Sequence, residues 1–202
     1  MFFSLLPVIS YGQYFNMLLN PSGEIDGSGS VIETPDGHYL IDVFQDIGSE
    51  DYNGIAKIDG ITGDTLWHKA YGETGVLEAS SWLTEGTDGH YITCGTHQVG
   101  TNPPDAYLVK YSSSGDTLWT RRFGTPSGYE QFFGLTITRD SNYVMAGQQT
   151  PPPGTNTNGY LMKTDTAGNQ LWDFTFGGGG YDLFLSVDTT MDGGYIMSGY
   201  SY

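Results

Sequence analysis

The chain has 202 residues and a formal net charge of −16, with only 7 Lys and Arg against 23 Asp and Glu. This balance argues against nucleic-acid binding, which needs clustered basic residues, and against an anionic membrane surface. The hydrophobic content of 38%, with 14% aromatic residues, is enough for a folded core. The single Cys94 allows no disulfide within the chain, and we expect it to be a small core residue.

The first segment, MFFSLLPVISYG (residues 1–12), resembles a secretory signal peptide with cleavage before Gln13. Its start lacks basic residues, so an apolar first strand is the alternative. Residues 1–12 are too few to span a bilayer, and no later apolar segment is longer. We therefore expect a secreted or cell-surface protein without membrane insertion. We expect Tyr14–Leu19 to be a lone strand available to close a ring.

From residue 28 onward the sequence repeats at steps of 52 or 53 residues. The members of the repeat include tryptophans, the glycines that follow them by five residues, turn aspartates and strand tyrosines: Trp67, Trp119, Trp172; Gly72, Gly124, Gly177; Asp36, Asp88, Asp140, Asp192; Tyr39, Tyr91, Tyr143, Tyr195. Self-similarity at this period indicates a propeller or a solenoid. Each repeat reads as four short strands, which is the pattern of a propeller blade.

The predicted fold is all-β, a partial β-propeller built of four-stranded antiparallel blades. The incomplete propeller domain covers residues 13–202, with about three and a half blades at about 28–71, 78–123, 130–176 and 182–202. In blade two the strands A to D, innermost first, are Glu78–Glu85, Tyr91–Thr96, Ala106–Tyr111 and Thr117–Phe123. Closed propellers have about 4 to 8 blades. We therefore expect the chain to continue into further blades, the alternative being a four-bladed ring completed by Tyr14–Leu19.

The connections between strands separate two faces of the predicted propeller. The A–B and C–D turns share one face and are tight, with Asp, Asn and Gly at positions that need αL or Asx geometry. The D–A and B–C connections share the other face, and the B–C loops are long and differ from one another: Gln45–Asn53, His97–Asp105, Gln149–Asn158. We call this the long-loop face. Such loops on a rigid scaffold usually carry binding, although they are solvated tips in the alternative interpretation.

Four acids recur at one position per blade, at the start of strand A on the long-loop face: Asp26, Glu78, Glu130, Asp182. Equivalent positions form an arc around the axis, so these carboxylates are the candidate ligand-binding residues. They indicate a weak site for a cation such as calcium, which prefers oxygen ligands. In the alternative interpretation each acid bonds backbone N–H groups of its own D–A loop, which is rich in glycine at Gly128 and Gly177–Gly180.

Other motifs indicate structure more than chemistry. Trp67, Trp119 and Trp172 are predicted to pack between blades, with a stacking platform for a sugar or quinone as the alternative. The histidines have no metal-ligand spacing with each other or with Cys94. No serine lies in a Gly-x-Ser-x-Gly elbow. We therefore predict no catalytic residue and no cofactor, apart from the calcium hypothesis.

Two family resemblances follow from these motifs. Asp59, Thr62, Gly63 and Trp67 form a segment similar to the tryptophan-docking repeat of pyrroloquinoline-quinone propellers. That resemblance implies the fold, because the family's catalytic Asp and calcium-bound cofactor pocket have no counterpart that can be located here.

The second set of matching segments resembles secreted bacterial β-propeller-repeat proteins over about residues 28–202: Asp192-Gly193-Gly194-Tyr195-Ile196…Gly199, Tyr160…Lys163-Thr164-Asp165…Gly168…Trp172, Phe176-Gly177-Gly178. This family implies a large exported or surface protein, often with a C-terminal type IX sorting domain, and generally without an assigned activity.

Two functions remain open on the sequence. The first is a non-enzymatic extracellular propeller module that scaffolds or binds a protein or glycan partner through the long-loop face. The alternative is the N-terminal part of a quinone- or carbohydrate-processing propeller enzyme whose catalytic residues lie beyond residue 202.

Overall fold

The computed structural model describes residues 25–27, 29–47, 50–71, 76–154 and 156–202. The signal-like segment 1–12, the expected strand Tyr14–Leu19 and Gly72 lie outside these described residues. Every regular element in the described ranges is a β-strand. None of the described residues forms a helix long and apolar enough to cross a membrane.

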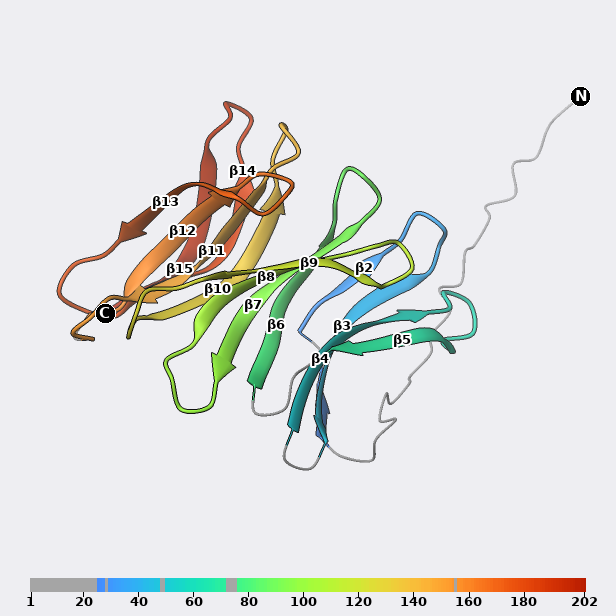
Figure 1. Ribbon diagram of the computed structural model, residues 1–202. Helices are drawn as coiled ribbons and strands as arrows, with labels where there is room; N and C mark the ends of the chain where they lie inside the picture. Colours follow the sequence, from blue (N-terminus) through green and yellow to red (C-terminus); the bar gives the residue numbers. More distant parts are fainter. Residues whose placement is uncertain (1–24, 28, 48–49, 72–75, 155) are drawn as a thin grey trace, which may run out of the picture.

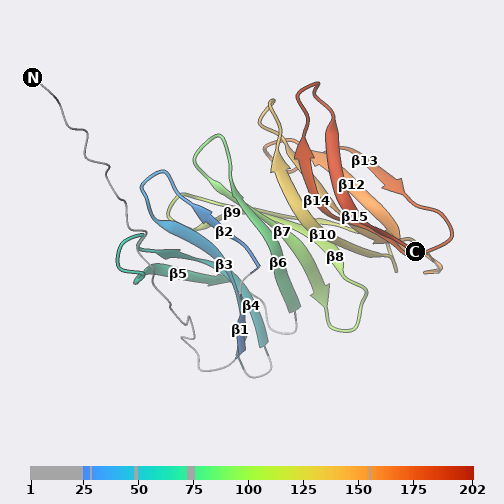
Figure 2. The ribbon, with the colours of Figure 1, turned by 180° about the vertical axis from the view of Figure 1, so that it is seen from behind.

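The strands form four antiparallel sheets in chain order, one for each predicted repeat (Figures 1 and 2). The first contains β1 (Ile25–Gly27), β2 (Val31–Glu33), β3 (Tyr39–Ile47), β4 (Glu50–Ile58) and β5 (Thr65–Tyr71). The second contains β6 (Val76–Glu85), β7 (Tyr91–Val99), β8 (Asp105–Tyr111) and β9 (Thr117–Phe123). The third contains β10 (Tyr129–Ile137), β11 (Tyr143–Thr150), β12 (Asn158–Thr164) and β13 (Gln170–Phe176), and the fourth β14 (Asp182–Thr189) and β15 (Tyr195–Ser201). The prediction of a partial propeller with four-stranded antiparallel blades is confirmed.

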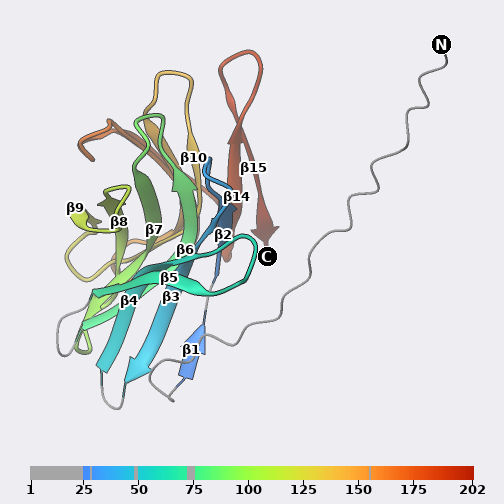
Figure 3. The ribbon, with the colours of Figure 1, turned by 90° about the vertical axis from the view of Figure 1, so that its right-hand side faces the viewer.

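Successive sheets pack face to face through clusters of buried side chains, and in the side view of Figure 3 they lie one behind another. Because side chains alternate along a strand, each of the two middle blades presents apolar residues to both neighbours. In β8, Tyr107, Val109 and Tyr111 join the cluster shared with blade one. Ala106 and Leu108 join the cluster shared with blade three. Cys94 is free and buried in this second cluster, so the core role expected for it is confirmed.

The tight turns have the predicted backbone geometry. The A–B turns place Gly37, Gly89 and Gly193 at positive φ, and Ser141 takes the same role in blade three with φ of 62°. The C–D turns place glycines at φ between 78° and 86°: Gly63, Gly115, Gly168. Figure 1 shows the A–B hairpins together at one end of the molecule and the β7–β8 connection at the other.

A repeated bulge bends the innermost strands, and the sequence did not predict it. The pairing of strand A with strand B shifts at Ser80/Trp82, Phe132/Gly134 and Phe184/Ser186 in blades two to four. In blade one the same place separates β1 from β2, which both pair with β3. A bulge increases the local twist, so it curves each blade at the same height.

The predicted long loops are shorter than expected, and their stated bounds are wrong. The ladder continues to the pairs Asp46↔Asp51, His97↔Asp105 and Gln149↔Asn158, whose residues the sequence predicts to lie in loops. Polar side chains do not interrupt an antiparallel ladder, because its hydrogen bonds join backbone groups. The connection between β7 and β8 is therefore residues 100–104, and that between β11 and β12 is residues 151–157.

The repeated tryptophans lie between blades. The ring of Trp119 is 6.3 Å from that of Tyr143 in the next blade, and Trp172 is 5.6 Å from Tyr195. The C–D glycine of the following blade lies against the indole. A Cβ on Gly115 would be 2.6 Å from Trp67, and one on Gly168 would be 3.1 Å from Trp119. Gly124 and Gly177 lie instead beside polar side chains, Asp105 and Asn158.

Candidate functional site

The recurring acids open the A strands, as the spacing indicates. Asp26 lies in β1 opposite Gln45, and Glu78, Glu130 and Asp182 lie at or near the first residues of β6, β10 and β14. Each is therefore in a different blade, at the long-loop end of its innermost strand.

Three of the acids, Glu78, Glu130 and Asp182, bond groups of their own blade. Glu130 is 1% exposed, and its Oε1 accepts hydrogen bonds from Thr125 Oγ1 at 2.8 Å and Gln149 Nε2 at 3.2 Å. Burial raises the pKa of Glu130, an effect that these hydrogen bonds partly offset. Asp182 accepts a bond from the backbone N–H of Gly178, in its own D–A loop. Within the described ranges, no three His, Cys, Asp or Glu side chains gather as a metal-binding group. The ligand role of the acids therefore stays a prediction.

Glu78 belongs to a polar chain that the sequence did not reveal. Its Oε1 lies 3.0 Å from His97 Nδ1, and His97 Nε2 lies 2.9 Å from Arg122 Nη1. Arginine is always protonated and only donates, so His97 Nε2 is the acceptor and His97 Nδ1–H donates to Glu78. His97 and Glu78 are buried, with 6% and 7% exposure. Both ring nitrogens are thus engaged, and neither is free to take a proton from a bound molecule.

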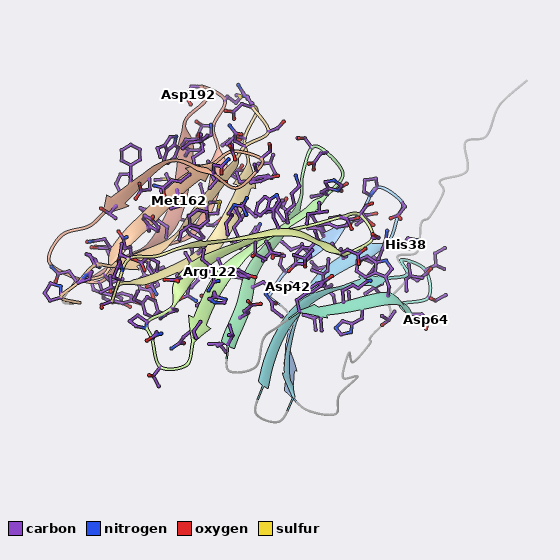
Figure 4. The ribbon with its side chains drawn as sticks, in the orientation of Figure 1. His38, Asp42, Asp64, Arg122, Met162 and Asp192 are labelled. Atoms are coloured by element: carbon purple, nitrogen blue, oxygen red, sulfur yellow. The ribbon has the colours of Figure 1, made fainter. Side chains whose placement is uncertain are left out.

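This chain of side chains borders a cavity of about 410 Å³ between blades one and two. Tyr71, Tyr107 and Tyr111 line it together with Arg122, which Figure 4 labels on β9. Burial raises the pKa of the Tyr107 phenol, and the Glu78 charge raises it further. Tyr107 and Tyr111 lie on one face of the second sheet because side chains alternate along β8, and Arg122 shares that face because it pairs with Tyr107. The alternation was visible in the sequence, but the register was not.

A second hollow, of about 570 Å³, lies on the long-loop face between blades two and three. We call it the loop groove. Its wall comes from β6 and β7, the 100–104 connection, the start of β10 and the end of β11. Every residue that lines it is uncharged, and the polar ones include Thr96, Gln98, Asn102, Ser127, Tyr129 and Gln131. A neighbouring hollow of about 380 Å³ shares Asn102, Pro103 and Ser127 with it.

Several groove side chains are held by hydrogen bonds. Gln98 Nε2 donates to the carbonyl of Asn102 at 2.8 Å. Gln131 Oε1 accepts from Tyr129 Oη at 3.0 Å and from Gln148 Nε2 at 3.3 Å. Thr96, 5% exposed, has a buried Oγ1 without a hydrogen-bond partner among the described residues. Sequence reasoning selected the face but missed this groove, because its walls meet only when blades two and three pack.

No family model matches the chain, and no curated protein matches its sequence. The geometry of these three hollows is therefore the basis for a functional proposal.

Proposed function

We propose that this chain is a non-enzymatic extracellular propeller module that binds a partner, a protein or a glycan, through its long-loop face. The observation that carries the proposal is the loop groove, which combines side chains from two blades and several connections. The opposite face consists of tight turns closed by local hydrogen bonds, such as Gly115 N–H to the Ser112 carbonyl at 2.9 Å. Loops on a rigid scaffold are the usual place for recognition, and residues 100–104 and 151–157 are the loops of this face.

The extracellular location is part of the proposal. The signal-like segment 1–12 supports it, as does the similarity of the repeats to those of secreted bacterial propeller proteins. The net charge of −16 suits a soluble module that does not bind nucleic acid. Packed blades can do without disulfides, which accords with the single, buried Cys94.

An orientation experiment tests this proposal. Thr62→Cys introduces a thiol on the tight-turn face, and Thr101→Cys introduces one on the long-loop face; both positions are exposed. Each variant is labelled with a thiol-reactive biotin reagent. Cys94 is buried, and burial raises the pKa of its thiol, so the reagent labels the introduced cysteine. Each protein is immobilised and exposed to a panel of extracellular proteins and glycans. We expect capture through the Thr62 tether and loss of capture through the Thr101 tether. Equal capture in both orientations, or none in either, contradicts the proposal.

The second candidate is an enzyme that processes a quinone or a carbohydrate, with its catalytic residues beyond residue 202. The polar chain Glu78–His97–Arg122 beside a 410 Å³ cavity favours it, because buried ionisable groups in a cavity are common in active sites. The engagement of both His97 nitrogens argues for the binding module as the first choice. A catalytic domain encoded after Tyr202 would reverse this order.

Calcium at the recurring acids is a separate proposal with its own test. If calcium binds the recurring acids Asp26, Glu78, Glu130 and Asp182, it stabilises the folded state by mass action. The thermal midpoint of the wild type then rises with calcium and falls with a chelator, and Glu78→Gln with Glu130→Gln abolishes the difference. A wild-type midpoint that calcium leaves unchanged excludes the site.

A further inference from the structure

The loop groove has the charge character of a site for a neutral ligand. None of its lining residues is charged at neutral pH, although the chain as a whole carries 30 Asp, Glu, Lys and Arg residues. Moving a charged ligand group from water into such a site costs free energy unless an opposite charge compensates it. The nearby Glu130 does not alter this, because it is 1% exposed and bonded to Thr125 and Gln149.

The groove offers hydrogen-bonding groups of the kind that recognise hydroxyls. Gln98, Asn102 and Gln131 contribute amide groups, each of which pairs a donor with an acceptor. The Gln131 carbonyl oxygen is occupied by Tyr129 and Gln148, so its NH₂ group is presented as a donor. The buried Oγ1 of Thr96 lacks a protein partner in the described part of the chain. Such a group is costly unless a ligand or water satisfies it.

An aromatic surface lies beside these polar groups. Tyr129 is 36% exposed, and its hydroxyl is anchored to Gln131 at 3.0 Å. Pro103 and Pro104 line the same groove from the facing connection. An amphipathic tyrosine with a fixed hydroxyl presents an apolar ring while its polar end stays satisfied. Rings of this kind suit the C–H face of a sugar.

Ser127 lines the groove, and its backbone has a conformation that is unfavourable for residues other than glycine. It occupies the left-handed region with φ of 65°, in a turn that Gly128 N–H closes on the Thr125 carbonyl at 2.9 Å. With Pro126 before it, this is the turn position that glycine normally takes. Strained residues persist where the surroundings hold them, and they cluster at ligand sites.

We propose that the loop groove binds a neutral oligosaccharide, with Tyr129 as the ring platform and Gln98, Asn102, Ser127 and Gln131 bonding hydroxyls. The adjacent hollow of about 380 Å³ shares Asn102, Pro103 and Ser127, is also lined by His97 and Asp105, and provides room for further sugars of the chain. This inference rests on the proposed function and specifies the partner of the same face.

The test uses the full chain and titrates it with named hexasaccharides. The neutral probes are cellohexaose, xylohexaose, maltohexaose and chitohexaose, and the acidic control is hexagalacturonate. We expect at least one neutral probe to bind by calorimetry and the acidic one to bind at least tenfold more weakly. Tyr129→Ala should weaken neutral binding by about tenfold or more, as truncation of an aromatic anchor does.

A matched pair of serines separates binding from stability. Ser127→Gly and Ser141→Gly both relieve a positive φ, of 65° and 62°, but Ser141 lies in a tight turn on the opposite face. We expect both variants to keep or raise the thermal midpoint, and only Ser127→Gly to lose about three- to tenfold in affinity, the value of one hydrogen bond.

The outcomes distinguish this inference from the proposed function. If none of the neutral probes binds, or if Tyr129→Ala and Ser127→Gly bind as the wild type does, the carbohydrate inference is overturned. If the orientation experiment still captures another partner only through the Thr62 tether, the long-loop function stands without it. If Ser141→Gly lowers affinity as much as Ser127→Gly does, the groove is not the site.

Discussion

Single carboxylates in this protein occupy two opposite environments. Glu130 is buried, its Oε2 has no hydrogen-bond partner among the described residues, and burial raises its pKa. Asp140 is exposed, and its pKa is lowered to about 2 by the Thr138 hydroxyl and by Lys163, 2.9 Å away. Asp36 repeats this arrangement with Lys57 and Thr34, also with a pKa of about 2. The first environment opposes the charged form, and the second favours it.

Glu130→Gln should stabilise the protein at neutral pH. A raised folded-state pKa means that this carboxyl favours folding below its unfolded pKa, and that the contribution is lost as the pH rises through the folded pKa. Glutamine can accept the same bonds from Thr125 and Gln149 without a buried charge. Urea unfolding should therefore show a gain for the variant at pH 7 that disappears near pH 4. A variant less stable than the wild type at pH 7, with no recovery at pH 4, contradicts this.

Asp140→Asn should show the opposite pH dependence and serves as its control. A lowered folded-state pKa gives stability that is present above the unfolded pKa and is lost as the pH falls toward about 2. The variant should be less stable than the wild type at pH 7, and the difference should shrink between about pH 4 and pH 2. A constant difference over this range would show that the ion pair does not cause it.

At the scale of the element, the C–D turn of one blade is the platform for the tryptophan of the blade before. Gly115 needs both its positive φ of 86° and its missing side chain, since a Cβ there would be 2.6 Å from the Trp67 ring. Gly89, in an A–B turn, has a similar φ of 71°, but open space surrounds its Cβ position. Substitution of Gly89 therefore reports only the cost of the left-handed backbone, whereas substitution of Gly115 reports that cost together with the steric clash against Trp67.

Gly89→Ala should cost about 1–2 kcal/mol, the penalty of a left-handed conformation for a residue with a Cβ. Gly115→Ala should cost about 2–5 kcal/mol, because overpacking against Trp67 adds about 1–3 kcal/mol. Chemical denaturation of both variants measures the difference. Equal losses would mean that the turn moves away from the indole without cost, so that the contact does not hold the blades together.

The same elements show what the sequence could and could not predict. Trp67, Trp119 and Trp172 and the turn glycines determine the blade count, because their spacing and φ requirements are local. The bulges at Ser80/Trp82 and Phe132/Gly134 arise from the curvature of a packed sheet, and no residue type marks them. The contact of His97 with Arg122 depends on register across β7, β8 and β9, which the spacing of repeats does not determine.

At the scale of the whole molecule, the four sheets pack in a row, and no other described sheet covers the outer face of the last one, β14–β15. Within the described residues β15 pairs only with β14, and its Ile196 and Tyr200 are 62% and 43% exposed. An exposed strand edge beside apolar side chains is a template for pairing with another chain. This surface therefore favours association with additional β-structure.

The chain should self-associate through β15 as its concentration rises. Ile196→Lys places a charge on this strand and should shift sedimentation toward the monomer. Val31→Lys, at a similarly exposed position in β2, is the control and should leave association unchanged. If the wild type stays monomeric throughout, or if both variants act alike, the edge is not the contact.

The central claim is that recognition takes place on the long-loop face, and hydrogen exchange tests it directly. Exchange is measured with and without the ligand captured by the chain tethered at position 62. We predict that protection gained on binding is concentrated in residues 98–104, 125–131 and 150–154, the segments that form the loop groove. Protection concentrated instead in the opposite turns, residues 60–64, 113–116 and 140–142, would contradict the claim.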